Sequence, residues 1–247
     1  MTADPLAPLL ELAGVAEAIA GARERVDQAL RHRALRREGG RIAAEVGLRC
    51  AVASAALEGS GYEVERVRAG TVTDPVLQGA LRVGGALDGL ADRWRRAPRQ
   101  VLARLHVLAA RDVVPPDDLG RPVPDPAVAT RLDALSALLT GGTGVPPTVL
   151  AAVTHGELLA LRPFAGPAGV VARAAGRLTL IAAGVDPRGL VAVEVGHHAR
   201  EPEYVGAAGA FATGTPDGLR SWFRHYAAAI EHGAAELESI ADQLAGR

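Results

Sequence analysis

The sequence contains no lysine, no asparagine, only one cysteine and 3% aromatic residues. Cys50 has no partner for an internal disulfide and cannot build a multi-cysteine zinc site, so we interpret it as a small apolar residue of a helix. Because lysine is missing, arginine supplies all 27 basic side chains, against 28 acidic ones, and the net charge is −1. This balance gives no general attraction to nucleic acid or to an anionic membrane. We therefore expect neither as a partner.

Long apolar runs are also missing from the chain. No stretch approaches the length needed to span a membrane, and the N-terminus lacks the charged start and the cleavage pattern of a signal peptide. We therefore expect a cytoplasmic protein. The chain is instead rich in small aliphatic residues: 49% of its 247 residues are hydrophobic, which is enough to bury a core of Ala, Val and Leu.

Glycine and proline divide the chain into two predicted regions. Residues 1–37 have the apolar spacing of a helical arm, which ends at the Arg-Glu-Gly-Gly sequence before the main domain, residues 38–247. An arm that packs on the main domain is the simpler interpretation, and a dimerisation arm is the alternative. Asp74 followed by proline predicts a helix start, and residues 231–244 predict a separate terminal helix.

The most informative segment is LRPFAGPAGVVAR, residues 161–173. Apolar spacing predicts a helix over 148–161 that ends at Pro163, because a proline ring disfavours the helix before it. A second helix is predicted over 168–183, with Gly184 at its end. The loop between them presents the amides of a helix N-terminus, which is a ready anion site, and Arg173 lies one turn into that helix.

This helix, loop and helix resemble the core of the Fic (Fido) family. The family signature is His-Pro-Phe, two residues, Gly-Asn-Gly-Arg, two residues and Arg. The positions that match are Pro163, Phe164, Gly169 and Arg173. The positions that depart from the signature carry Arg162 for the His, Gly166 for the acid, Pro167 for the first Gly, Ala168 for the Asn and Val170 for the first Arg.

The resemblance extends over roughly residues 40–235. Ser54, Glu58 and Gly59, at the end of a predicted helix over 41–59, have the spacing of the family's inhibitory helix. The Leu-His segment before residue 112 and the terminal helices from residue 201 resemble their family counterparts. The resemblance implies an all-α Fic-like domain with a short β-hairpin flap over 112–126. Because that segment is rich in proline, which has no amide to donate, an ordered surface loop is the alternative.

The resemblance also implies a role for the positions of the motif, whether or not their residues match the signature. In the family the His is the general base, the acid holds magnesium, and the loop and its arginines bind nucleotide phosphates. The implied ligand-binding residues are Arg162, Gly166, Ala168, Gly169 and Arg173, and the implied inhibitory residues are Ser54, Glu58 and Gly59. In relatives the inhibitory Glu reaches the second arginine, so we predict an ion pair between Glu58 and Arg173.

Other residues could in principle supply a base or a metal ligand. His155 lies about two helical turns before Arg162 and is expected to face the interior, while Glu157 is turned to another part of the helix surface. His106 is interpreted as a hydrogen-bonded side chain at a helix interface. The adjacent His197 and His198 point in different directions and are expected to be solvated or to cap a helix, so no metal site is predicted.

Nucleotidyl transfer needs a base to accept the hydroxyl proton and a cation to neutralise phosphate charge. Arg162 stays protonated and Gly166 has no carboxylate. Our main hypothesis is a catalytically silent Fic-fold protein, without catalytic residue, metal or cofactor, that binds a protein partner or a phosphate-bearing ligand; homodimers are implied by analogy alone. The alternative is a nucleotidyl or phosphoryl transferase with altered catalytic residues, using ATP and magnesium on protein hydroxyl groups. A third is a vestigial pocket with a functional outer surface.

Overall fold

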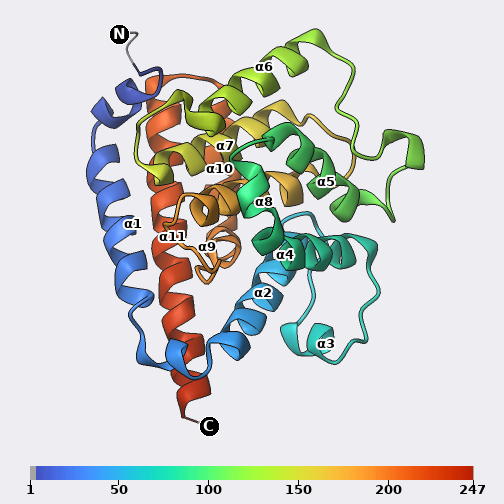
Figure 1. Ribbon diagram of the computed structural model, residues 1–247, viewed down its shortest axis with the longest axis vertical. Helices are drawn as coiled ribbons and strands as arrows, with labels where there is room; N and C mark the ends of the chain where they lie inside the picture. The colour runs from blue at the N-terminus through green and yellow to red at the C-terminus, as the bar shows by residue number, and fades with distance from the viewer. Residues whose placement is uncertain (1–3, 247) are drawn as a thin grey trace.

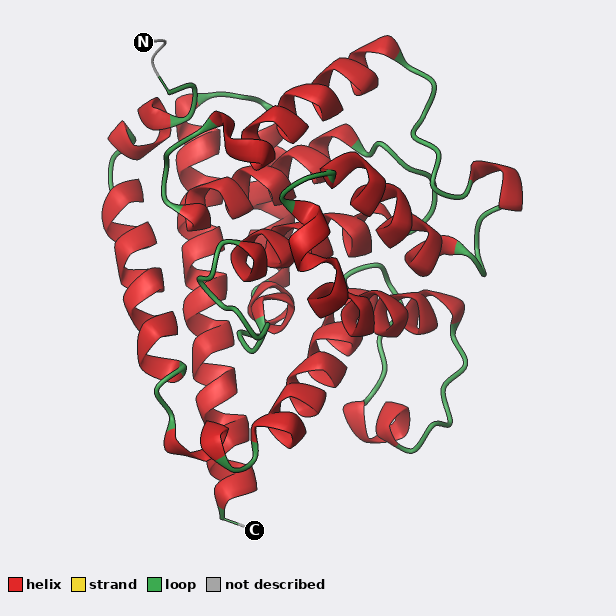
Figure 2. Ribbon diagram, viewed as in Figure 1, coloured by secondary structure: helices red, strands yellow, loops and turns green. Residues whose placement is uncertain are grey.

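The computed structural model describes residues 4–246, and within them helices are the only regular secondary structure (Figure 2). Each described helix is too short or too polar to span a bilayer. The helices are η1 (Ala7–Glu11), α1 (Val15–Ala29), η2 (Arg33–Arg36), α2 (Gly39–Ala56), α3 (Val64–Arg68), α4 (Pro75–Trp94), α5 (Pro98–Ala110), η3 (Pro116–Asp118), α6 (Pro126–Ala137), η4 (Leu138–Gly142), α7 (Pro147–Leu161), α8 (Ala168–Ala182), α9 (Val193–Ala199), α10 (Glu201–Ala212) and α11 (Pro216–Ala245).

Helix α8 lies at the centre of the fold, and every residue from Ala168 to Ile181 is buried. One apolar cluster packs it against α4 and α5, and a second cluster joins α1, α7, α10 and α11 on its other side. Most of its residues are small or apolar, as expected for a helix in such a central position, but Arg173 and Arg177 are buried with them. The start of α8 is therefore held by the core on several sides.

Helix ends follow the sequence signals where those signals are local. The Asp74 side chain accepts a hydrogen bond from the Leu77 amide at 2.9 Å and caps α4. Helix α7 ends at Leu161, two residues before Pro163. Gly184 follows α8 with a φ of +73°, the left-handed conformation that glycine adopts without strain. The helices predicted over 148–161 and 168–183 are thus confirmed to within one residue at each end.

The described part of the N-terminal arm packs on the main domain. Helix α1 lies along α11, with Val15, Ile19, Ala22 and Val26 buried (Figure 1). Residues 1–3 of the predicted arm, and residue 247, lie outside the described residues. The helical pattern breaks at Arg37 and Glu38, within the predicted Arg-Glu-Gly-Gly segment, and α2 begins at Gly39. The separate terminal helix predicted over 231–244 is wrong, because α11 runs without interruption from Pro216 to Ala245.

The segment over 112–126 does not form the β-hairpin that the resemblance implied. It contains only the short helix η3, and its main-chain link to the motif loop is a hydrogen bond from the Val123 amide to the Pro163 carbonyl at 2.8 Å. Strand pairing requires amide donors along the chain. The residues here that lack one are Pro115, Pro116, Pro122, Pro124 and Pro126. The ordered-loop alternative describes this segment correctly.

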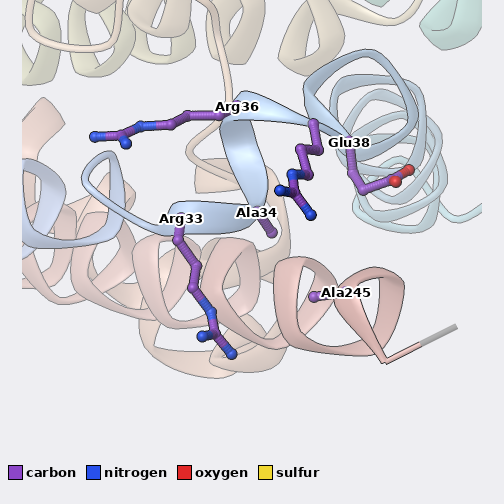
Figure 3. Close-up of a pocket in the computed structure, with 6 residues that line it drawn as sticks. Arg33, Ala34, Arg36, Glu38 and Ala245 are labelled. Carbon is purple, nitrogen blue, oxygen red and sulfur yellow. The ribbon is translucent and has the colours of Figure 1, made fainter.

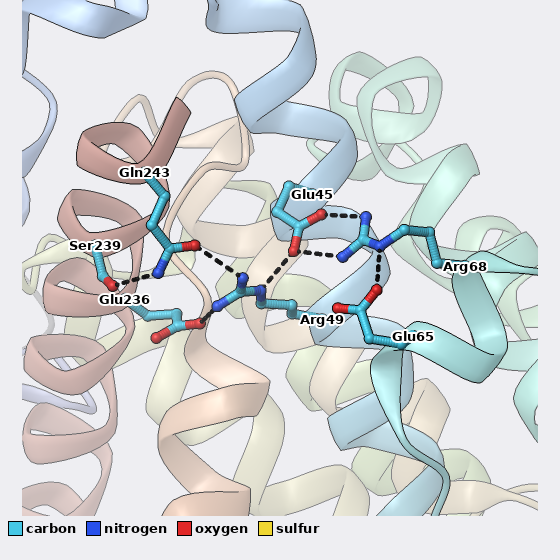
Figure 4. Close-up of polar contacts among 7 residues, drawn as sticks. All are labelled: Glu45, Arg49, Glu65, Arg68, Glu236, Ser239 and Gln243. Atoms are coloured by element: carbon cyan, nitrogen blue, oxygen red, sulfur yellow. Dashed lines mark hydrogen bonds and ion pairs between the residues drawn. The ribbon is translucent and has the colours of Figure 1, made fainter. Parts of the chain in front are cut away.

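Helix α2 is tied to its neighbours by a network of arginines and carboxylates (Figure 4). Arg49 bonds Glu45 at 2.7 Å and Glu236 of α11 at 2.5 Å. Arg68 of α3 bonds the same Glu45 at 2.6 Å and Glu65 at 3.0 Å. The bond from Arg68 is the largest cause that lowers the pKa of Glu45 below its usual value. Cys50, on the same helix, is buried, as expected for an apolar role.

Candidate functional site

The predicted ion pair between helix α2 and helix α8 is present. Arg173 Nη2 donates to Glu58 Oε1 at 2.7 Å and to the Ser54 carbonyl at 2.8 Å. Its Nε donates to Ser54 Oγ at 3.0 Å, and its Nη1 donates to the Tyr204 hydroxyl at 3.2 Å. The Arg173 side chain is 2% exposed. Each of its three nitrogens is therefore engaged with protein atoms, and the guanidinium is out of contact with solvent.

Glu58 reaches Arg173 because of where α2 ends. Gly59 has a φ of +88°, and the Ser60 amide turns back to the Ala55 carbonyl at 2.9 Å, which ends the helix in the way glycine commonly does. The Glu58 carboxylate then lies over Gly169 in the first turn of α8. A Cβ at residue 169 would collide with that carboxylate. Gly169 thus makes room for Glu58 at the positive end of the helix dipole.

The amides of the motif loop are less available to an anion than the sequence predicted. The Ala168 amide donates to the Gly166 carbonyl at 2.8 Å, the Val170 amide donates to the Pro167 carbonyl at 3.2 Å, and Pro167 has no amide. With the Glu58 carboxylate beside Gly169, much of the expected anion cradle is filled by the chain's own groups.

Gly166 is required by its local geometry. Its φ is +74°, and a Cβ there would lie 2.6 Å from Val114 Cγ2. A carboxylate-bearing residue would need both a strained backbone and a shift of Val114. In addition, residues 4–246 contain no group of three or more His, Cys, Asp or Glu side chains placed to hold a metal ion. The residues at this position therefore do not fit a magnesium ion.

Arg162 is exposed and lies directly after α7. It adopts φ +45° and ψ +57°, and it is the only described residue other than glycine with a positive φ. Its amide donates to the Leu158 carbonyl at 3.0 Å, which closes the helix. A residue with a Cβ adopts this conformation at an energetic cost. The side chain at the position to which the resemblance assigns the general base is thus a guanidinium at the surface, on a strained backbone.

His106 holds the motif loop against the 112–126 segment. The Gly120 amide donates to its Nδ1 at 2.9 Å, so the proton lies on Nε2, which donates to the Ala165 carbonyl at 2.9 Å. The ring also stacks on Phe164, with centroids 4.8 Å apart. Burial lowers the pKa of His106 and favours the neutral ring. The predicted hydrogen-bonded role is confirmed.

His155 and Glu157 are both engaged elsewhere. His155 is 1% exposed, and its Nε2 lies 3.0 Å from the Tyr204 hydroxyl. Burial, followed by the charge of Arg173, holds the pKa of His155 well below its usual range, so the ring is neutral. Glu157 pairs with Arg131 of α6 at 2.6 Å. His155 faces the interior as expected, and both side chains are held by contacts within the protein.

The solvated role expected for His197 is wrong. His197 is 1% exposed, and its Nδ1 lies 3.0 Å from Nε2 of His225. His198, in contrast, is exposed. Adjacent residues on helix α9 point to different faces, and one face packs on α11. Tyr204, which joins His155 to Arg173, was not identified from the sequence. Its only signal was a position in the first turn of the predicted terminal helices.

No family sequence model matches this chain, and no curated protein sequence matches it either. Among solved structures, it is similar to a Fic family protein from Desulfovibrio desulfuricans G20, with a TM-score of 0.71 and 22% identity over 90% of this chain and 74% of that one. It is also similar to the 134–508 fragment of C. elegans Fic-1, with a TM-score of 0.69 and 18% identity over 97% of this chain and 75% of that one.

A Glu-to-Gly variant of the Fic-1 fragment gives a TM-score of 0.74 at 19% identity, over 94% of this chain and 74% of that one. The three structures agree with the all-α fold that the resemblance implied. The chain has the Fic fold.

Proposed function

Because the chain has the Fic fold, we propose that it is a catalytically silent member of that fold which acts by binding a protein partner at the motif loop. The observation that supports this most directly is the guanidinium of Arg162 at the position of the general base. A guanidinium stays protonated at any physiological pH and cannot accept a proton from a hydroxyl group. The Fic fold alone does not supply a general base, because function depends on the residues of the site and not on the fold.

The surroundings of Arg173 support the same proposal. A nucleotide phosphate would need both this guanidinium and the positive end of α8. The guanidinium already donates to Ser54, Tyr204 and Glu58, and the Glu58 carboxylate covers the start of α8. The outer face of the loop is open instead. Arg162 is exposed there, and Val113 and Val123 of the adjoining segment are 40% and 46% exposed. Exposed apolar side chains beside an unpaired arginine are typical of a protein-binding surface.

The strained backbone of Arg162 adds to this argument. Strain at an exposed residue lowers stability without any compensating contact, and such strain is often found at functional positions. A binding role for the side chain would explain why an arginine rather than a glycine occupies this conformation.

The first test measures chemistry and nucleotide binding. We expect no transfer of AMP from ATP and magnesium to the protein itself or to a co-purifying protein. We also expect no heat of ATP binding by calorimetry, for the native chain and for Glu58→Gly alike. AMP transfer that Arg162→Ala abolishes would overturn the proposal in favour of an enzyme with altered catalytic residues. Tight magnesium-dependent ATP binding would also count against the proposal, because it would favour the enzyme.

The second test measures protein binding, using two exposed valines as a matched pair. A partner captured from the native cells should be lost by Arg162→Ala and by Val123→Ser, both at the loop. It should be retained by Val205→Ser, since Val205 is 61% exposed on α10. Equal retention by all three variants would place the binding surface elsewhere and would contradict the proposal.

A further inference from the structure

A groove of about 710 Å³ lies between α10 and α11, outside the motif loop. Its lining is charged rather than apolar, and three of its side chains are arginines: Arg200, Arg220 and Arg224. Ser221 and His225 of α11 also line it. The volume falls within the range of roughly 300–1,000 Å³ typical of small-molecule sites. The groove is therefore large enough for a metabolite.

Two of the three arginines have only weak partners. Arg200 pairs with Glu203 at 2.5 Å and Arg220 pairs with Asp217 at 3.0 Å. Both pairs join residues only three apart in the chain, and their side chains are 40–86% exposed. Exposed pairs of this kind contribute little to stability, so the guanidinium groups can turn toward a ligand at low cost.

Arg224 differs from the other two, because none of the carboxylates in residues 4–246 pairs with it. With three guanidinium groups and two carboxylates, the groove carries a net positive charge. A ligand with two negative charges would complement it better than the protein's own side chains do.

His225 of α11 also lines the groove, and one nitrogen of its buried ring has no hydrogen-bond partner. It is 5% exposed, its Nε2 lies 3.0 Å from His197 Nδ1, and its own Nδ1 has no hydrogen-bond partner. A neutral ring has one donor and one acceptor nitrogen, so whichever ring donates in this pair, one nitrogen of each ring is left over. When His197 donates, the His225 Nδ1 carries a buried N–H without an acceptor, which is unusual in a folded protein.

We propose that this groove binds a small molecule through a phosphate monoester group. Arg224, Arg200 and Arg220 neutralise the phosphate charge, and the bound group lies beside the ring of His225. A phosphate monoester offers several strong acceptor oxygens and up to two negative charges, which suits three guanidinium forks better than a single carboxylate does. Neither Arg162, Arg173 nor any residue of the motif loop lines the groove. The phosphate site and the proposed function can therefore be tested independently.

Titration calorimetry with inorganic phosphate, at constant ionic strength set by chloride, tests the site. Arg224→Gln should weaken binding by about tenfold, the effect of losing one charge-assisted hydrogen bond. The control is Arg33→Gln, in an arginine-rich cleft formed by the turn between α1 and α2 and by the end of α11 (Figure 3). Arg33 and Arg36 extend in different directions there, and no buried histidine lines that cleft. Arg33→Gln should leave phosphate binding unchanged.

Two results would overturn the proposal: no phosphate binding by the native chain, or equal effects of Arg224→Gln and Arg33→Gln. Nitrogen-15 spectra of labelled histidines give a second readout that does not depend on a variant. Phosphate should shift the His225 ring signals, and unchanged signals at saturation would also refute the site. Sedimentation with phosphatidic acid vesicles, without binding of inorganic phosphate, would replace the small molecule by a lipid surface and overturn the assignment.

Discussion

Arg162 and Arg173 belong to the same short motif segment, yet their surroundings are opposite. Arg173 is 2% exposed and donates hydrogen bonds to three residues, whereas Arg162 is exposed on a strained backbone. The half of the site around Arg173 joins α2, α8 and α10, so its residues contribute to the fold whether or not any reaction occurs. The half around Arg162 contributes little to the fold. Similarity to Fic proteins around Arg173 therefore gives no information about catalysis. Only the residues around Arg162 can give it.

The largest expected effect tests this contrast directly. Arg173→Ala should lower the free energy of unfolding by about 3–5 kcal/mol, because it leaves the Glu58 carboxylate, the Ser54 carbonyl and the Tyr204 hydroxyl without their donor. Arg162→Ala, the matched control, should change it by less than about 0.5 kcal/mol, as exposed substitutions usually do. Urea denaturation measures both. Similar losses for the two variants would remove the distinction between the two halves.

A smaller loss is expected when the partner carboxylate is removed instead. Glu58→Ala should cost about 1–3 kcal/mol, since Arg173 keeps its bonds to Ser54 and Tyr204 but loses its charged acceptor. Glu63→Ala is the control, because Glu63 is exposed just beyond the same helix end. Thermal unfolding of the two variants gives the comparison. An unchanged melting temperature for Glu58→Ala would show that the pair adds nothing to the fold.

The sequence predicted this half of the site well because its signals were local and carried by the resemblance. The Glu58–Arg173 pair followed from two short motifs, and the helix ends followed from Asp74, Pro163 and Gly184. Tyr204 was missed because its contact with Arg173 joins positions 31 apart on different helices. No periodicity within one helix reports such a contact. The burial of His197 was missed for the same reason, since it depends on how α9 packs against α11.

The motif loop itself was the part that the sequence predicted least well. A helix N-terminus suggested free amides, but the backbone turns so that Gly166 and Pro167 accept bonds from Ala168 and Val170. The hairpin failed because its prolines supply no donors. In both places the outcome depended on where each backbone group finds its partner, which residue types alone do not fix.

Helix α2, which carries Ser54, is also held by the ion pairs of Glu45, and these pairs give a pH-dependent test of the region around Arg173. The pKa of Glu45 is lowered in the folded state, chiefly by the bond from Arg68, so this carboxylate stabilises the fold above its unfolded pKa of about 4.5. That contribution is lost as the pH falls below 4.5 through the lower, folded pKa. Stability curves of the native chain and of Arg68→Gln should therefore differ at pH 7 and converge toward pH 3. A constant difference would mean that Arg68 acts through packing.

The smallest effect expected is a gain at Arg162. Arg162→Gly should raise the free energy of unfolding by up to about 1 kcal/mol, because glycine relieves the left-handed strain but also gives the unfolded chain more freedom. Arg162→Val should lower it, since a β-branched side chain tolerates a positive φ poorly. If only the backbone conformation matters at this position, urea denaturation should give changes in the free energy of unfolding of opposite sign for the two variants. A loss for Arg162→Gly would mean that the arginine side chain stabilises the fold through contacts of its own, and its contrast with Arg173 would then be one of degree.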